Sequence, residues 1–434
     1  MLRFVIVYSY IVIFAGWILN IFHFPPDMAK SVIIALDLIP FLLFAFFFRL
    51  RPRLLVLPDT VQFWRIVLLF FLCSLFTTMM HGGNVGEACK HFGLMFRYTP
   101  LASMLLFAKS SHRDLKTFIM HFTIISSILV GIGFIELIGG PGVAQYFMPI
   151  TQEFSYINTI FDETKEMDLV GGFVFGIFPN TVDYSFFLLL SYIFLSNSQI
   201  KINRVFLALI YVIVIFFTGS KATLLIFILA VSLQLSKNKV WIKAFWGVVL
   251  LVGGILLYEF WEIFYWTVFI DSQSSRLGYI MFTLPDFLSE FSFDTFFGVS
   301  PDKQLAWGKI NSYANAPMMT WNIEHMTSFE DEFYVALPVY YGMLGFLLLA
   351  VFYFKLYKAL ICLQFPDNLM RYQTIINSLF LCLLVAPLFN QITILRPFSL
   401  FFWIILGIIA SRKQCNPVCL TKKENLYVEV RSNN

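Results

Sequence analysis

The sequence predicts an all-α membrane protein with about twelve transmembrane helices and one large polar lobe between the ninth and the tenth. Composition is the first reason. Of the 434 residues, 59% are hydrophobic and only 13% are charged, whereas about 25% of the residues of a soluble domain are charged. The second reason is that apolar runs close to the 20 residues that cross a bilayer recur along the chain. The net charge of +4 is a small excess, so nothing favours nucleic acid as a partner.

Twelve apolar segments define the predicted helices. They cover residues 4–22, 32–48, 63–80, 92–108, 117–138, 176–196, 205–219, 222–236, 241–260, 333–354, 373–390 and 396–411. The first has no small-residue cleavage pattern, so we expect it to be retained as a helix rather than removed as a signal peptide. The fourth contains Arg97 and Pro100.

The distribution of basic residues predicts the orientation. An even number of helices places both termini on one side, and most of the 30 Lys and Arg residues fall on that side. Basic residues are enriched in cytoplasmic loops, so we expect both termini in the cytoplasm. The predicted organisation is helices one to nine in residues 1–260 with a smaller outer loop at 139–175, a large outer lobe at 261–332, the last three helices at 333–411 and a cytoplasmic tail at 412–434.

The outer lobe is the longest polar interval of the chain. Its stretch SSRLGYIMFTLPDFLSEF (274–291) has apolar residues at helical spacing, which predicts an amphipathic helix near the membrane surface. At its end the chain re-enters the membrane after His325, Asp331 and Glu332. A carboxylate or a His in a partly desolvated crevice can act as a general base. The alternative for each of these residues is a solvated acidic rim.

Three cations are candidates for binding an anion. Arg276 lies in the lobe, and a guanidinium suits bidentate binding of phosphate; the alternative is an arginine that reaches the interface. Lys221 lies in the turn TGSKA, where it could donate to the same anion or simply end two helices. Arg97 lies inside a predicted span, where a charge is costly and often functional; the alternative is a structural ion pair, with Asp37 as a possible partner.

Several enzyme classes lose their usual support. The sequence has no nucleophile elbow, P-loop, HExxH motif or dinucleotide fingerprint, which are the marks of many hydrolases, kinases, metalloproteases and dehydrogenases. No cofactor motif is present. Cys415 and Cys419 lie near no His, so they are a weak signal for zinc.

Four stretches resemble a known family. They are GIFPNTVDYSFFLLL (176–190), TGSKATLL (218–225), SSRLGY (274–279) followed by FGVS (297–300), and DEFYVALPVYYGMLGF (331–346). In their order and spacing they resemble the bacterial O-antigen polymerases of the Wzy type and the related O-antigen ligases. Thr181 and Glu332 depart from the family pattern, which has Pro and Asn at these positions.

The resemblance implies a reaction. Lys221 and Arg276 would hold the diphosphate of a glycan linked to undecaprenyl diphosphate, aided by Arg97, and Arg276 would also act in catalysis. Asp331 would be the base, with His325 as the alternative. Glu332 and Asp183 are candidates for binding sugar.

The same resemblance implies surroundings and partners. The site would face the periplasm from the bacterial inner membrane, with no metal and no cofactor. The partners would be the lipid-linked glycan, membrane lipid and, as a further candidate, a protein that regulates chain length. Two alternatives stay open: an O-antigen ligase, and a flippase or transporter of the lipid-linked oligosaccharide.

Overall fold

The computed structural model describes residues 1–50, 58–107, 112–147, 174–198, 203–235, 284–312, 333–361, 370–386 and 395–411. Every regular element in these ranges is a helix, and the only extended pairing in them is an isolated bridge between Ser198 and Met370. The all-α class predicted from the sequence is therefore confirmed.

Five helices are long and apolar enough to cross a membrane: α1 (Leu2–Ile21), α2 (Pro26–Leu50), α3 (Pro58–Met80), α6 (His112–Gly139) and α19 (Phe333–Ile361). Five shorter apolar helices are α9 (Thr181–Ser196), α10 (Arg204–Phe217), α11 (Lys221–Leu235), α20 (Tyr372–Val385) and α21 (Arg396–Ser411). The others are α4 (Val85–Phe96), α5 (Thr99–Phe107), α7 (Pro141–Ala144), η2 (Gln145–Phe147), α15 (Leu284–Ser289), α16 (Phe293–Phe297) and α17 (Lys303–Ser312). The predicted span 241–260 lies outside the described residues, and the count of twelve stays a prediction.

The fourth predicted span is not one continuous helix. α4 ends at Phe96 and α5 begins at Thr99. Pro100 accounts for the break, because a proline has no N–H to donate and fits best in the first turn of a helix, which is where it lies in α5. The hydroxyl of Thr99 donates to the carbonyl of Phe96 across the break at 2.6 Å. Arg97 lies at this break and is turned into the protein, with 4% of the residue exposed.

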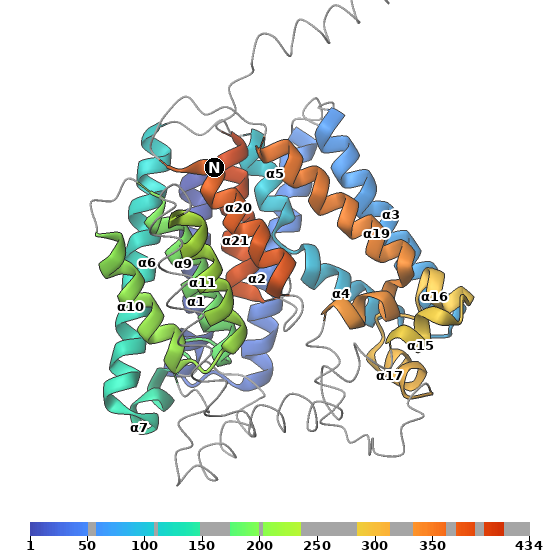
Figure 1. Cartoon of the computed structure of the whole chain (residues 1–434), viewed down its shortest axis with the longest axis horizontal. Helices are drawn as coiled ribbons and strands as arrows, with labels where there is room; N and C mark the ends of the chain where they lie inside the picture. The colour runs from blue at the N-terminus through green and yellow to red at the C-terminus, as the bar shows by residue number, and fades with distance from the viewer. Residues whose placement is uncertain are drawn as a thin grey trace, which may run out of the picture.

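Two helices, α9 and α21, form the centre of the bundle. Every α9 residue from Asp183 to Ser196 and every α21 residue from Pro397 to Ile409 is buried. α21 packs against α5 and α9, and Figure 1 shows these helices grouped with α1, α6, α10, α11 and α20. A helix that is apolar all round is expected at such a fully enclosed place.

Outer helices instead expose large apolar side chains. On one face of α3 these are Leu68, Leu69, Leu72, Phe76, Met79 and Met80. α1, α2 and α10 also carry such side chains. Extended apolar surface of this kind is what a helix presents to lipid, so the fold is that of an all-α membrane protein.

A second group of helices lies beside the bundle. α3 and α19 pack against each other, and the short helices α15, α16 and α17 lie at one end of this pair (Figure 1). We call residues 284–312 the lobe segment, because this is the part of the predicted outer lobe that the structure describes. Of the stretch predicted as an amphipathic helix, residues 284–291 are described, and Leu284–Ser289 form α15, which buries Phe287.

Candidate functional site

The predicted site residues divide into two sets. Arg97 and Asp183 are described with their side chains. Lys221 is the first residue of α11, but its side chain lies outside the described part of the protein. Four more also lie outside the described residues: Asp331, His325, Arg276 and Glu332. The smaller outer loop predicted at 139–175 is described only at its two ends, and the tail at 412–434 is not described.

A buried ion cluster is built around Asp37 of α2. Its Oδ2 accepts from Nη1 of Arg97 at 3.1 Å and from Nη2 of Arg396 at 2.7 Å. Its Oδ1 accepts from the hydroxyl of Tyr98 at 3.0 Å. The pairing of Arg97 with Asp37 that the sequence suggested is therefore confirmed. Asp37, Arg97 and Arg396 come from α2, the α4–α5 break and the start of α21, so the cluster joins distant parts of the chain.

Asp183 lies in the first turn of α9 and also acts on this cluster. It is 6% exposed, and its charge acts on Arg396. Its place is fixed by Asn180, whose side chain accepts from the backbone N–H of Asp183 at 2.7 Å and so begins α9. An aspartate or asparagine in such a turn satisfies N–H groups that have no partner within the helix. The ion pairs of the cluster are those of the Asp37 carboxylate with the guanidinium groups of Arg97 and Arg396, and Asp183 acts on Arg396 through its charge.

Because these side chains are largely buried, each charge of the cluster depends on its partners for compensation. The side chain of Arg97 is 5% exposed and that of Asp37 is 16% exposed, while that of Arg396 is 26% exposed. Removing one partner of a buried pair leaves a charge without compensation and costs about 3–5 kcal/mol. The cluster can hold the helices in register, and Arg396 is its most accessible cation.

Two of the family-like stretches are joined by hydroxyl groups. Ser185 of α9 and Thr223 of α11 are 2.8 Å apart, and Thr223 is 2.8 Å from Ser220 in the TGSKA turn. Gly219 in this turn has φ +71°, a conformation that glycine adopts without steric cost. The structure therefore brings the start of α11, and with it the backbone of Lys221, against the first turns of α9.

The other two stretches meet at a pair of glycines. Gly298 of FGVS and Gly342 of α19 lie back to back, and a Cβ built on Gly298 would be 2.5 Å from the backbone nitrogen of Gly342. Val299 N–H donates to the carbonyl of Val339 at 2.8 Å. Gly342 interrupts α19 with φ 66° and ψ 178°, a region open almost only to glycine. The lobe segment is therefore docked on a break in α19.

α4 lies between the ion cluster and this docking point. The Nδ1 of His91 in α4 is 2.5 Å from the hydroxyl of Tyr341, the residue that precedes the Gly342 break. That hydroxyl also donates to the sulfur of Met95 at 3.7 Å. Arg97 follows the same helix directly. α4 thus connects the buried cluster to the place where the lobe segment is docked.

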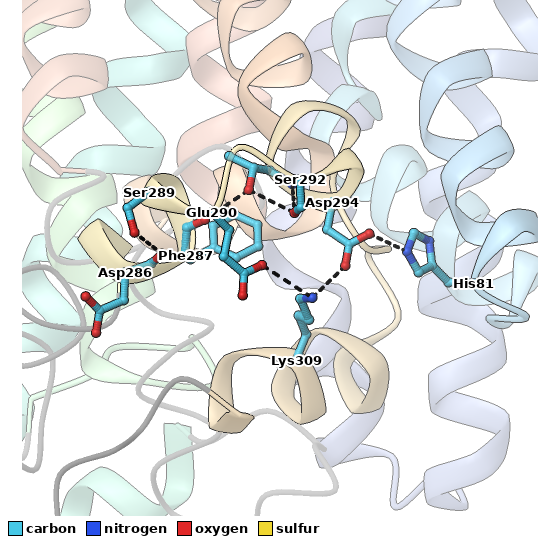
Figure 2. A network of polar contacts seen from close by, with 9 residues as sticks. His81, Asp286, Phe287, Ser289, Glu290, Ser292, Asp294 and Lys309 are labelled. Carbon is cyan, nitrogen blue, oxygen red and sulfur yellow. Dashed lines mark hydrogen bonds and ion pairs between the residues drawn. The ribbon is translucent and has the colours of Figure 1, made fainter.

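A partly buried ion network fixes the lobe segment to the end of α3. Asp294 of α16 accepts from Nζ of Lys309 at 2.8 Å and lies 2.8 Å from Nε2 of His81 (Figure 2). Glu290 adds a longer contact to Lys309 at 3.9 Å. Partial burial disfavours ionised Asp294, but the hydrogen bonds from Lys309 and His81 outweigh it and lower the pKa of its carboxyl. Asp294 is therefore held as a carboxylate.

No protein-family model and no curated protein matches the chain.

Sequence reasoning missed several of these residues. Arg396 is the first residue of the last predicted helix. Its sequence context, RPF, indicates where that helix begins but not that Arg396 binds Asp37. His81 and Asp294 are separated by more than 200 residues, so nothing in their spacing links them. Gly298 and Gly342 belong to two of the family-like stretches, but nothing in the sequence indicates that their backbones approach too closely to leave room for a Cβ on either residue. Among the described residues, no group of three His, Cys, Asp or Glu side chains could hold a metal ion.

Proposed function

We propose that the protein is an O-antigen polymerase, a membrane glycosyltransferase that joins oligosaccharide repeat units linked to undecaprenyl diphosphate. In this proposal twelve helices cross the bacterial inner membrane, both termini are cytoplasmic, and the lobe at 261–332 faces the periplasm. The observation that carries the proposal is the docking of the lobe segment on α19 through Gly298 and Gly342. A group transfer needs its reacting groups held in a fixed geometry, and a lobe attached to the membrane helices provides one.

The proposed site lies where the chain passes from the lobe into α19. Asp331 precedes the first residue of α19 by two positions, and the docked lobe segment contacts the same helix. His325 is the alternative base. Arg276 lies eight residues before α15 in sequence. Support for this location is thus the docking of the lobe segment on α19 at Val339 and Gly342, in the same helix whose first residue follows Asp331 by two positions.

The proposed reaction is a displacement at an anomeric carbon. Asp331 takes the proton from a hydroxyl of the incoming repeat unit, and that oxygen bonds to the anomeric carbon of the growing glycan. The bond from this carbon to the phosphate oxygen breaks, and undecaprenyl diphosphate leaves with the electron pair. Lys221 and Arg276 stabilise the negative charge of the leaving diphosphate. No metal and no cofactor takes part in this scheme.

Other residues have supporting parts in the proposal. Arg97 and Arg396 supply positive charge behind the diphosphate, although both guanidinium groups already bind Asp37. Glu332 and Asp183 bind sugar hydroxyls. Further partners are membrane lipid and a protein that regulates chain length.

One observation favours a different class, a transporter of the lipid-linked oligosaccharide. The buried cluster of Asp37, Arg97 and Arg396 joins three separate parts of the helical bundle, and ionisable residues inside transmembrane segments often mark a substrate pathway. We favour the enzyme because docking the lobe segment has no evident use for transport. An O-antigen ligase stays the nearest alternative among enzymes.

The proposal is tested with purified protein in detergent and a synthetic repeat unit on undecaprenyl diphosphate, without nucleotide sugar and with a chelator present. We expect a ladder of longer glycans from the wild type and none from Arg276→Ala or Asp331→Ala. Two control variants also replace one cation or one carboxylate with alanine, at exposed positions. They are Lys90→Ala, since the side chain of Lys90 is 62% exposed, and Asp286→Ala, since Asp286 is exposed as well. Both should keep the ladder.

The other outcomes identify the alternatives. A wild type that yields no ladder but moves the intact substrate across reconstituted vesicles is a transporter. A wild type that transfers glycan only to an added lipid A core acceptor is a ligase. Either result overturns the polymerase proposal.

A further inference from the structure

The lobe segment carries an exposed aromatic patch formed by Phe291, Phe293 and Phe296. The exposed fractions of these residues are 91%, 44% and 56%. The rings of Phe293 and Phe296 each lie against Phe297, with centroids 4.8 and 5.4 Å apart. Phe293 and Phe296 therefore share the surface of α16 around Phe297, and Phe291 lies two residues before Phe293 in the sequence.

Phe291 is unusual in its backbone as well as its exposure. It has φ +46°, a left-handed conformation that is uncommon for residues other than glycine and is an outlier for bulky ones. The residue that directly follows Phe291 is Ser292, which caps α16 by accepting from the N–H of Thr295 at 3.3 Å. The chain is thus turned sharply at Phe291, and its ring is left outside the packed part of the segment.

This aromatic patch continues the lipid-facing surface of α3. Phe76, Met79 and Met80 lie at the end of the apolar face of α3, with exposed fractions of 51%, 68% and 62%. The ring centroid of Phe76 is 6.5 Å from that of Phe293. The face begins at Leu68, Leu69 and Leu72, inside the candidate span Phe63–Met80. One apolar surface therefore runs from the membrane-crossing part of α3 onto the lobe segment.

Polar groups border the aromatic patch, because the ring centroid of His81 lies 6.4 Å from that of Phe293. The ion network of His81, Asp294 and Lys309 holds α16 and α17 to the end of α3 (Figure 2). Asp286 and Glu290 are also exposed. A segment whose exposed aromatic side chains are bordered by charged groups is typical of elements that lie in the membrane interface.

We propose that the patch of Phe291, Phe293 and Phe296 inserts into the membrane–water interface beside the end of α3, so that lipid covers it. The lobe segment then rests on the bilayer surface instead of standing clear in water. The ion network fixes the height of α16 above α3, and the aromatic side chains reach into the region where lipid headgroups meet acyl chains. This binding surface does not depend on the proposed polymerase activity.

Photo-crosslinking tests which molecule covers the patch. p-Benzoylphenylalanine replaces Phe291, Phe293 or Phe296, one at a time, in full-length protein in vesicles of phosphatidylethanolamine and phosphatidylglycerol. The replacement keeps an aromatic ring at an exposed position, so the fold should tolerate it. Leu72 is the matched lipid-facing control, and Gln304, an exposed residue of α17, is the water-facing control. Adducts are identified by mass spectrometry after illumination.

We expect lipid adducts at the three Phe positions, as for a segment that lies in the interface. The yield of these adducts should be within about tenfold of the yield at Leu72 and at least about tenfold above the yield at Gln304. Adducts between two copies of the chain, with lipid adducts only at Leu72, would assign the patch to self-association. A yield at the three positions equal to that at Gln304 would place the patch in water. Either result overturns the proposal, and the Leu72 adduct shows in each preparation that the protein is inserted.

Discussion

Replacing Gly298 with alanine should release the lobe segment from α19. Gly298 has φ 86° and ψ 169°, and a Cβ there would lie 2.5 Å from both the backbone nitrogen of Gly342 and the carbonyl oxygen of Tyr340. Both neighbours are backbone atoms, so no side-chain rotation can make room. The added methyl group must separate the two chains or distort them.

The expected cost follows from two contributions. An alanine in this region of φ and ψ is strained by about 1–3 kcal/mol. Forcing an additional methyl group into a packed contact costs about another 1–3 kcal/mol. The sum, about 2–6 kcal/mol, is comparable to what burial of Phe287 and Val299 contributes, at roughly 1.5–3 kcal/mol per large apolar side chain. At the lower end, about 2 kcal/mol corresponds to on the order of a 30-fold change in an opening equilibrium.

Hydrogen exchange followed by mass spectrometry measures this opening. In Gly298→Ala, amides of residues 284–306 should exchange on the order of 30-fold faster or more, while amides of α9 keep their rate. Gly308→Ala is the matched control, because Gly308 is in α17 and nothing lies within 4 Å of its added Cβ. It should exchange no faster than the wild type, since alanine favours a helix interior. Equal exchange in the two variants would refute the docking argument.

Two further changes test the ion networks. Asp37→Ala should destabilise the protein by about 3–5 kcal/mol, because Arg97 and Arg396 lose their shared carboxylate inside the bundle. Thermal unfolding in detergent measures this loss of stability. A loss below about 1 kcal/mol would contradict the reasoning. The lowered pKa of Asp294 means that its contribution to stability is complete above the ordinary carboxyl pKa of about 4 and is lost as pH falls through the lower folded value. Asp294→Asn should therefore reduce stability by about 1–2 kcal/mol at pH 7, and the difference from wild type should shrink below about pH 4. A difference that stays constant down to pH 2 would count against the network with Lys309.

Much of the helical architecture could be predicted from the sequence, because runs of apolar residues leave few alternatives. The segment 205–219 was predicted as a helix and is α10 (Arg204–Phe217), and 396–411 is α21 with the same bounds. The fourth span was harder. The segment contains Arg97 and Pro100, but the sequence alone does not say whether such an apolar run bends or breaks. Local backbone chemistry at Thr99 and Pro100 decides that outcome.

The site was less accessible to sequence reasoning, because its contacts join distant residues. Asp37 could be suggested as a partner for Arg97, since few other charges fall inside spans. Arg396 could not, because an arginine at a helix end is expected to reach the membrane surface. Nor could spacing reveal that Gly298 meets Gly342, because the two residues lie in separate stretches of the sequence.

The most direct test of glycosyl transfer is to compare the number of glycosidic bonds formed with the amount of undecaprenyl diphosphate released. The purified wild type, in detergent so that no compartment exists to transport across, is incubated with the lipid-linked repeat unit, and both free undecaprenyl diphosphate and glycan length are measured by mass spectrometry. A polymerase releases one undecaprenyl diphosphate for every glycosidic bond added, and Asp331→Ala should abolish both together. Substrate that stays intact, with no lipid diphosphate released, would contradict glycosyl transfer by this protein.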